Sequence, residues 1–179
     1  GDIMRKHLKK YLPNHDAVHG NRWLRPFRNS LLHPRLWHLN RHSAAGAVAA
    51  GLFCGLIPGP LQMIGAAICA LVFRVNLPLA LLVTLYTNPF TIVSLYVLAY
   101  EIGRFATGDR TGFVDPPAFD MTRFVAWTEA MQTWMIGVGK PLGIGLVLLA
   151  ITLAIAGYVL TKTVWRLYLI RAWRQRKAR

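Results

Sequence analysis

The feature that most constrains this chain is a set of three long apolar runs without a single Lys, Arg, Asp, Glu or His. They cover residues 44–73, 77–100 and 142–161, and they are 30, 24 and 20 residues long. A helix of roughly 20 apolar residues crosses the hydrocarbon core of a bilayer, so each run is long enough. Buried core helices of a soluble protein are the competing interpretation, but three such runs in 179 residues are unusual for that class. The runs therefore predict an all-α membrane protein.

The basic residues flank the apolar part of the chain. The formal net charge is +14, and nine of the 21 Lys and Arg residues precede Ala44 while seven lie from Lys162 onward. Basic segments next to membrane helices stay on the cytoplasmic side and are attracted by anionic lipid. We therefore expect membrane lipids, especially anionic ones, as partners. Nucleic acid is the alternative, but we find no helix-turn-helix, zinc-finger or RNP-like pattern and expect no specific nucleic-acid partner.

The first apolar run is interrupted by Pro58-Gly59-Pro60. Each proline lacks an N–H group and clashes with the preceding turn, so a helix cannot continue through this tripeptide. The two arms, 44–56 and 61–74, have 13 and 14 residues. Each arm would be about 20 Å long as a helix, which is short of the roughly 30 Å hydrocarbon core. We interpret 44–74 as a re-entrant hairpin that enters and leaves the membrane on one side. One long, kinked and tilted span is the alternative.

The second and third runs are interpreted as two spans. The second run has a milder break at Asn88-Pro89, and we expect a crossing helix over 77–100 that kinks or unwinds at mid-depth. The third run, 141–161, is expected to cross back. Segment 101–140 holds five of the seven acids, and we interpret it as an external loop. The apolar spacing over 121–135 predicts a surface-lying amphipathic helix within this loop.

The charges of the two tails also bear on the number of crossings. Two cytoplasmic tails require an even number of crossings, and a re-entrant first run followed by two spans satisfies this condition. Residues 1–43 are then a basic segment at the cytoplasmic interface, with an amphipathic helix from Pro34 that leads into the membrane. Residues 162–179 form a basic cytoplasmic tail. We expect no cleavable signal peptide, because the first forty residues are polar and basic.

The candidate functional residues gather at the two breaks. Irregular backbone at membrane depth is tolerated only where protein buries it or where it lines a wet cavity, and paired broken helices form the substrate sites of many transporters. Pro60 suits the first position of a helix before Leu61, and Asn88 can cap a helix that begins with Pro89. Such helix N-termini favour anionic groups. The candidate substrate-binding residues are Pro58, Gly59, Pro60, Gln62, Arg74, Asn76, Asn88 and Pro89.

Two simpler roles for these residues stay open at this point. The polar side chains at the breaks could serve only to satisfy the interrupted backbone. Arg74, in the short link between the first two runs, could be an ordinary anchor to lipid headgroups rather than a ligand for an anion.

The sequence offers no clear metal or catalytic site. All six histidines lie in the first 42 residues, and His38 and His42 are spaced i, i+4, but no Cys or carboxylate lies near them. No HExxH motif, Gly-rich phosphate loop or nucleophile elbow occurs. The apolar runs also hold no acid that could transfer a proton. We therefore expect no metal, no cofactor and no enzymatic activity.

An ordered set of motifs runs through most of the chain. They are PRLWHLNR at 34–41, GLFCGLIPGPLQ at 51–62, NLP at 76–78, TNP at 87–89, and the set Tyr96, Tyr100 and Gly103. In this order they resemble a bacterial inner-membrane family catalogued as domain of unknown function 2062, from about residue 10 to residue 165. The resemblance implies a small multi-helix inner-membrane protein of Gram-negative bacteria and carries no established activity. By architecture alone, a proline-broken hairpin also resembles membrane proteins that recycle polyprenyl-phosphate carriers.

These observations support two functional hypotheses. The first is a translocator, or part of one, for an anionic lipid or a small anion, because two half-helix N-termini meet in the apolar part of the chain. The second is a non-catalytic accessory or assembly subunit of a larger membrane complex. A homo-oligomer fits the first hypothesis and a stoichiometric partner fits the second. In both cases we expect a multi-pass protein of the bacterial inner membrane with both termini in the cytoplasm.

Overall fold

The computed structural model describes residues 34–178, and over these residues the protein is entirely helical. The helices in chain order are η2 (Pro34–Leu36), α4 (Arg41–Cys54), α5 (Leu61–Phe73), α6 (Leu77–Val83), η3 (Thr84–Tyr86), α7 (Ile92–Thr107) and α8 (Phe124–Lys177). The predicted all-α class is confirmed for the described residues. Most of the predicted interfacial segment 1–43 lies outside them.

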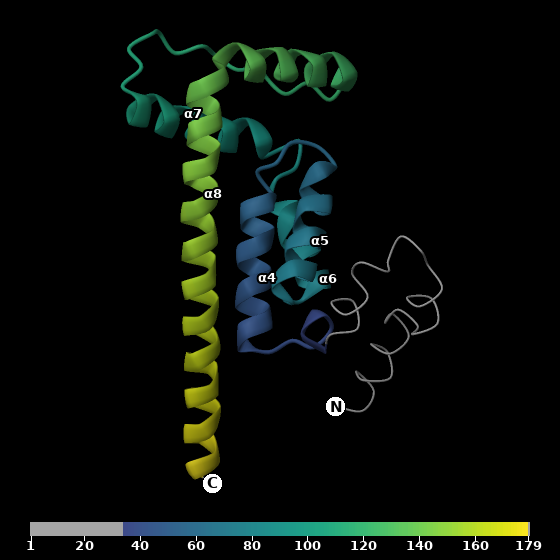
Figure 1. Cartoon of the computed structure of the whole chain (residues 1–179), viewed down its shortest axis with the longest axis vertical. Coiled ribbons are helices and arrows are strands. Elements are labelled where there is room, and N and C mark those ends of the chain that lie inside the picture. The colour runs from purple at the N-terminus through teal and green to yellow at the C-terminus, as the bar shows by residue number, and fades with distance from the viewer. Residues whose placement is uncertain (1–33, 179) are drawn as a thin grey trace, which may run out of the picture.

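Helices α4, α5 and α6 stand side by side and alternate in direction (Figure 1). The Sγ atoms of Cys54 and Cys69, which are 15 residues apart in sequence, are 3.6 Å apart. At the other end of the pair, the backbone N–H of Asn76 donates to the carbonyl of Ser43 over 3.3 Å. Segment 44–74 is therefore a helical hairpin, and the alternative of one long kinked span is wrong.

The hairpin turns where the prolines require it. Helix α4 ends at Cys54 and α5 begins at Leu61, so the turn includes Pro58 and Pro60. Between the two prolines, Gly59 has φ +70°, a left-handed conformation that glycine adopts without the steric penalty of a side chain. The predicted position of the turn is confirmed.

The start of α4 differs from the prediction. We expected an amphipathic helix from Pro34 onward, but the chain forms one 3₁₀ turn, η2, and the α-helix begins only at Arg41. The reason is a capping box: Asn40 Oδ1 accepts from the N–H of Ser43, and Ser43 Oγ accepts from the N–H of Asn40, both over 2.9 Å. An Asn held in this way has extended backbone and starts a new helix.

The second apolar run also differs from the prediction. Instead of one helix over 77–100, the chain forms α6 and η3, breaks at 87–91, and continues as α7 in another direction (Figure 1). Pro89 lacks an N–H donor, and local side-chain bonds stabilise the break. Among residues 34–178, α8 alone is long and apolar enough to cross a membrane. The predicted second span has no such helix.

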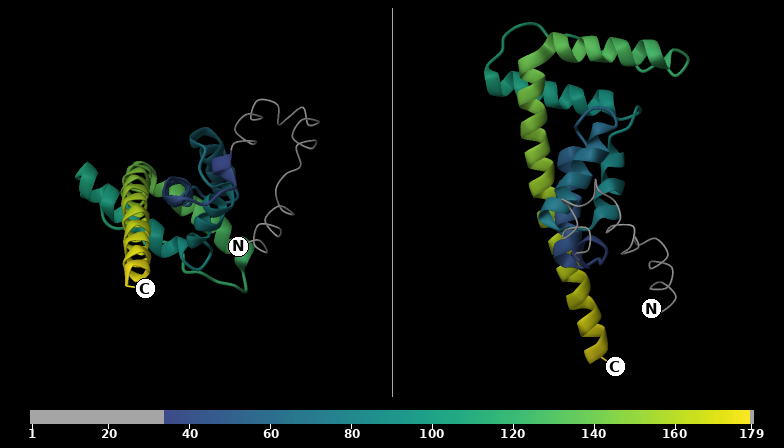
Figure 2. Two further views of the ribbon diagram at one scale, coloured as in Figure 1. Left: turned by 90° about the horizontal axis from the view of Figure 1, so that it is seen from below. Right: turned by 45° about the vertical axis from the view of Figure 1, so that its right-hand side comes forward.

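Helix α8 has 54 residues and bends at Gly139, where φ is +42° and ψ is −108°. The part before the bend, 124–138, lies across one end of the molecule, and the part after it, 140–177, runs alongside α4 (Figures 1 and 2). We call these parts the roof and the rod. The roof covers most of the predicted amphipathic helix over 121–135. One face of the roof is buried, through Trp127, Met131, Trp134 and Val138, so this helix is confirmed.

The rod and α7 cross at very short range. A Cβ atom built on Gly145 would overlap the carbonyl oxygen of Ala99, and one built on Gly103 would overlap the carbonyl oxygen of Pro141. The two backbones therefore touch directly, as small residues allow at helix crossings in membranes. This contact holds α7 at the level where the rod begins, just below the roof.

The antiparallel hairpin predicts an efficient disulfide between Cys54 and Cys69. They are the two cysteines of the chain and both are free thiols in the structure. Mild oxidation with copper-phenanthroline should therefore give an intramolecular disulfide, read as a loss of two protons in the intact mass and as protection from maleimide labelling. The variants Cys54→Ser and Cys69→Ser are the controls. Disulfide-linked dimers in place of the intramolecular product would contradict the hairpin.

The crossing of α7 and the rod predicts different effects for two glycines that lie two residues apart. Gly145→Ala forces the backbones apart and should lower the free energy of unfolding by about 3 kcal/mol, as overpacking does. Gly143→Ala is the matched control, because a Cβ atom there meets nothing within 4 Å and should raise helix stability slightly. Unfolding in detergent micelles measures both. Equal stability of the two variants would contradict the contact.

Candidate functional site

The two proline breaks meet at one cavity of about 420 Å³. Its lining includes six of the eight residues predicted to bind a substrate: Pro58, Gly59, Pro60, Gln62, Asn88 and Pro89. We call it the turn cavity. The sequence places these residues about 30 positions apart, and the alternating directions of α4, α5 and α6 bring both breaks to the same end of the molecule (Figure 1). Their juxtaposition was expected from the sequence and is present in the structure.

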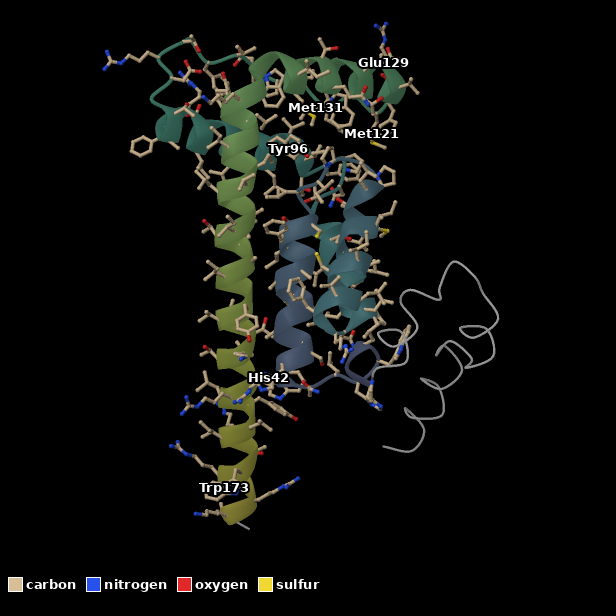
Figure 3. The ribbon with its side chains drawn as sticks, in the orientation of Figure 1. His42, Tyr96, Met121, Glu129, Met131 and Trp173 are labelled. Carbon is tan, nitrogen blue, oxygen red and sulfur yellow. The ribbon has the colours of Figure 1, made fainter. Side chains whose placement is uncertain are left out.

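The roof covers this cavity, which sequence reasoning missed. The roof residues that line it are Phe124, Trp127, Thr128, Met131, Gln132 and Met135, and Figure 3 shows Met131 on the side of the roof nearest Tyr96. Their spacing of three or four residues is the signal that the sequence contained, because it marks one face of a helix. We had assigned that face to the membrane surface rather than to a binding site.

Asn88 is occupied by the backbone of its own turn. Its Oδ1 accepts from the N–H groups of Phe90 (2.9 Å) and Thr91 (3.2 Å), and its Nδ2 donates to the carbonyl of Leu85 (3.2 Å). Helix α7 begins at Ile92, so Asn88 does not cap a helix that starts with Pro89, as we had expected. For this residue, the simpler role of satisfying broken backbone is the one that the structure supports.

Two tyrosines satisfy carbonyl groups at the end of α4. Pro60 has no N–H, so the carbonyl of Leu56 cannot receive its usual i+4 partner. The phenol of Tyr96 donates to this carbonyl over 2.7 Å, and the phenol of Tyr86 donates to the carbonyl of Leu52 over 2.6 Å. Tyr96 is fully buried. The tyrosines therefore join the second break to the first, which fixes the floor of the turn cavity.

Two residues that line the turn cavity carry buried polar atoms without a hydrogen-bond partner among residues 34–178. They are Oγ1 of Thr87 and Nε1 of Trp127, and the two residues are 5% and 6% exposed. The Thr87 hydroxyl lies near the phenol of Tyr86 but makes no hydrogen bond with it. A buried polar atom of this kind costs about 1–3 kcal/mol. Two of them at one cavity indicate that a ligand or water completes the site.

Arg74 and Asn76 lie at the opposite end of the hairpin and are not part of the turn cavity. Asn76 is a helix cap: its Oδ1 accepts from the N–H of Leu79 over 2.9 Å, and the residue is 6% exposed. Arg74 ends α5 in a left-handed conformation with φ +53°. It lines a second, larger cavity of about 740 Å³ between α4, α5 and the rod. The eight predicted residues therefore divide between two places.

The charged groups of the external loop lie outside both cavities. Hydrogen bonds from Thr111 lower the pKa of Asp109, and hydrogen bonds from Thr122 lower the pKa of Asp120. The expected Glu101–Arg104 pair is present, with 3.5 Å between Oε1 and Nη1. Over residues 34–178, no group of three or more His, Cys, Asp or Glu side chains is arranged to hold a metal ion.

Comparison with known proteins agrees with the motifs. The sequence model of a bacterial family, described as "Uncharacterized protein conserved in bacteria" (DUF2062), matches residues 24–174. The chain belongs to this family. The matched range includes both breaks, the roof and most of the rod, so the turn cavity lies wholly within the family's own sequence. No curated protein and no solved structure matches the chain.

The bond between Tyr96 and Leu56 predicts a specific loss of stability. Tyr96→Phe keeps the ring but leaves a buried carbonyl without a donor, so the free energy of unfolding should fall by about 1–3 kcal/mol. Tyr168→Phe is the control, because Tyr168 is 69% exposed on the rod. Denaturant unfolding in micelles compares the two variants with the parent chain. If Tyr96→Phe is as stable as Tyr168→Phe, the tyrosine does not hold the break together.

Proposed function

We propose that this protein is embedded in the bacterial inner membrane and binds an anionic lipid at the turn cavity, as a carrier or as part of one. The observation that supports this function best is the pair of buried polar atoms without partners at a cavity built from both proline breaks. The role that we propose is binding and movement of the lipid, without a chemical reaction.

The membrane placement rests on apolar surface that water would not tolerate. Large side chains of α5 and the rod are exposed, among them Leu61, Ile64, Val72, Ile155 and Leu160 at 54–65%. Contiguous exposed patches of this kind mark membrane or protein contacts. The rod also carries the apolar run 142–161, which is long enough to cross the hydrocarbon core.

The relative depth of the hairpin supports a re-entrant arrangement. Gly157 of the rod packs against Val48 and Leu52 of α4. From that level the rod continues 15 residues, about 22 Å, to Leu142, whereas the hairpin reaches Gly59 within seven residues, or about 10 Å. If the rod crosses the bilayer, the hairpin turns inside it. The start of α4 and the end of α8 then lie on the same side (Figure 1), which fits two basic cytoplasmic tails.

The orphaned groups select the chemistry of the ligand. The indole Nε1 of Trp127 can only donate a hydrogen bond, so the ligand atom next to it must be an acceptor. Gln62 from the first turn of α5 adds an amide to the lining, and the N-terminus of this helix adds the positive end of its dipole. Because phosphate oxygens are strong acceptors, a lipid phosphate fits this set of donors.

The rest of the lining suits a hydrocarbon chain. Met63, Met131, Met135, Ile92 and Phe124 line the cavity, and methionine adapts to irregular apolar shapes. A cavity of about 420 Å³ is within the usual size range for small-ligand sites. It is suited to the polar group of a lipid and the first part of its chain rather than to the whole molecule.

Two tryptophans of the roof give a matched test of this site. The Nε1 atom of Trp127 has no partner, whereas that of Trp134 donates to the carbonyl of Val114 over 2.9 Å. Trp127→Phe should weaken binding of dodecyl phosphate at least tenfold, as loss of a bond to a charged group does, and should not destabilise the protein. Trp134→Phe should lower the free energy of unfolding by about 1 kcal/mol and leave binding unchanged.

Binding is measured by calorimetry in micelles with dodecanol as the uncharged reference. Movement is measured in proteoliposomes as the rate at which a fluorescent phosphatidic acid becomes accessible to dithionite. Equal affinity of the parent chain and Trp127→Phe for dodecyl phosphate would refute the site. Equal affinity of the parent chain for dodecyl phosphate and dodecanol would refute the anionic ligand.

An accessory subunit is the second candidate function. The exposed stripe of α5, Leu61, Ile64, Ile68 and Val72, follows the spacing of a helix face that packs on another helix. Purification in a gentle detergent separates the possibilities: a different chain in fixed stoichiometry favours the accessory role. A single species or a homo-oligomer favours the lipid carrier.

A further inference from the structure

We propose a second lipid site, for an anionic phospholipid, in the cavity between α4, α5 and the rod. We call this cavity the base groove. It has a volume of about 740 Å³, and Arg74 and Tyr158 are among the residues that line it. The site rests on the membrane placement proposed above and does not depend on the turn cavity.

The groove has the depth of one bilayer leaflet. Its lining on α4 extends from His42 to Phe53, which is 11 residues and about 16 Å along a helix. This is close to half of the roughly 30 Å hydrocarbon core. Gly46, Ala49 and Ala50 of α4 and Ala154 of the rod line the groove, and these small side chains leave the volume that an acyl chain would fill. The occupant is therefore a bilayer lipid that lies parallel to the rod.

The open end of the groove is basic. Arg74 lines it and is exposed, and the ammonium group of Lys162 lies 4.6 Å from the centre of the Tyr158 ring. The three chain segments meet at the end of the molecule where Figure 3 shows His42. A guanidinium group at this level pairs with phosphate through two parallel hydrogen bonds.

No acid competes for these cations within the described residues. The five Asp and Glu residues of 34–178 all lie between Glu101 and Glu129, and Figure 3 shows Glu129 at the opposite end of the molecule from His42. The charge at the groove is therefore complementary to an anionic headgroup and to nothing else on this part of the chain. This arrangement favours an anionic phospholipid over a zwitterionic one.

The first arm of the test changes the charge. The full-length protein in micelles is mixed with equal amounts of phosphatidylglycerol and phosphatidylcholine, and native mass spectrometry counts the lipids that stay bound. One basic residue near a lipid surface gives a preference of about fivefold. Arg74→Gln should reduce this preference below twofold, and Arg74→Lys should retain most of it. Arg171→Gln, which removes a cation at the same end but outside the groove, should leave it unchanged.

The second arm fills the groove. Ala154→Leu places a larger side chain where the acyl chain lies and should remove the retention of both lipids. Ala156→Leu is the matched control on the same helix, because Ala156 is exposed and does not line the groove. If Arg74→Gln keeps the preference of the parent chain, or if Ala154→Leu retains as much lipid as Ala156→Leu, the site is refuted.

A third arm separates a lipid from a free anion. Glycerol 3-phosphate carries a phosphate without acyl chains, so it should not displace phosphatidylglycerol even at a hundredfold excess. Displacement would show an anion site without a lipid and would overturn the proposal. The two sites are distinguished by crossing the variants: Trp127→Phe should not change retention of phosphatidylglycerol, and Arg74→Gln should not change affinity for dodecyl phosphate.

Discussion

The structure depends on how the backbone freed by Pro58 and Pro60 is satisfied. A proline pair ends α4 and leaves carbonyl groups without their usual partners, and in an apolar environment each such group is costly. The phenol groups of Tyr86 and Tyr96 supply donors to two carbonyls of this region. Because Tyr86 belongs to η3 and Tyr96 to α7, these two bonds attach the second break to the first. The floor of the turn cavity follows from this attachment.

The roof is held by a different interaction. Gly103 and Gly145 allow α7 and the rod to touch through their backbones, and the rings of Tyr100 and Trp134 pack edge to face, 5.7 Å apart. Another set of rings, Phe90, Phe119 and Trp127, runs from the second break through the loop to the roof, with centroid distances of 5.4 and 4.9 Å. Close backbone contact and aromatic packing together keep the roof over the breaks.

The sequence predicted local features well and long-range ones poorly. The helical class, the turn at Pro58-Gly59-Pro60, the break near Asn88 and six residues of one cavity were all predicted, because proline and periodicity act over a few residues. The bend at Gly139 and the direction of α7 were not, because they depend on which residues 40 positions away can pack against them. The capping role of Asn76 and the separation of Arg74 from the turn cavity were missed for the same reason. Residues 77–100 look like one span by composition, since hydropathy does not record direction.

The bend at Gly139 has a mechanical consequence. The roof and the rod are both regular helix, and Gly139 is the residue between them with non-helical torsion angles. A Cβ atom at this position would meet nothing within 4 Å, so no neighbouring side chain restricts rotation there. A change in the angle between roof and rod therefore requires two torsion angles to change and no helical hydrogen bond to break on either side. Gly139 is thus the natural hinge through which the covered end of the molecule opens, with the long rod acting as the fixed post.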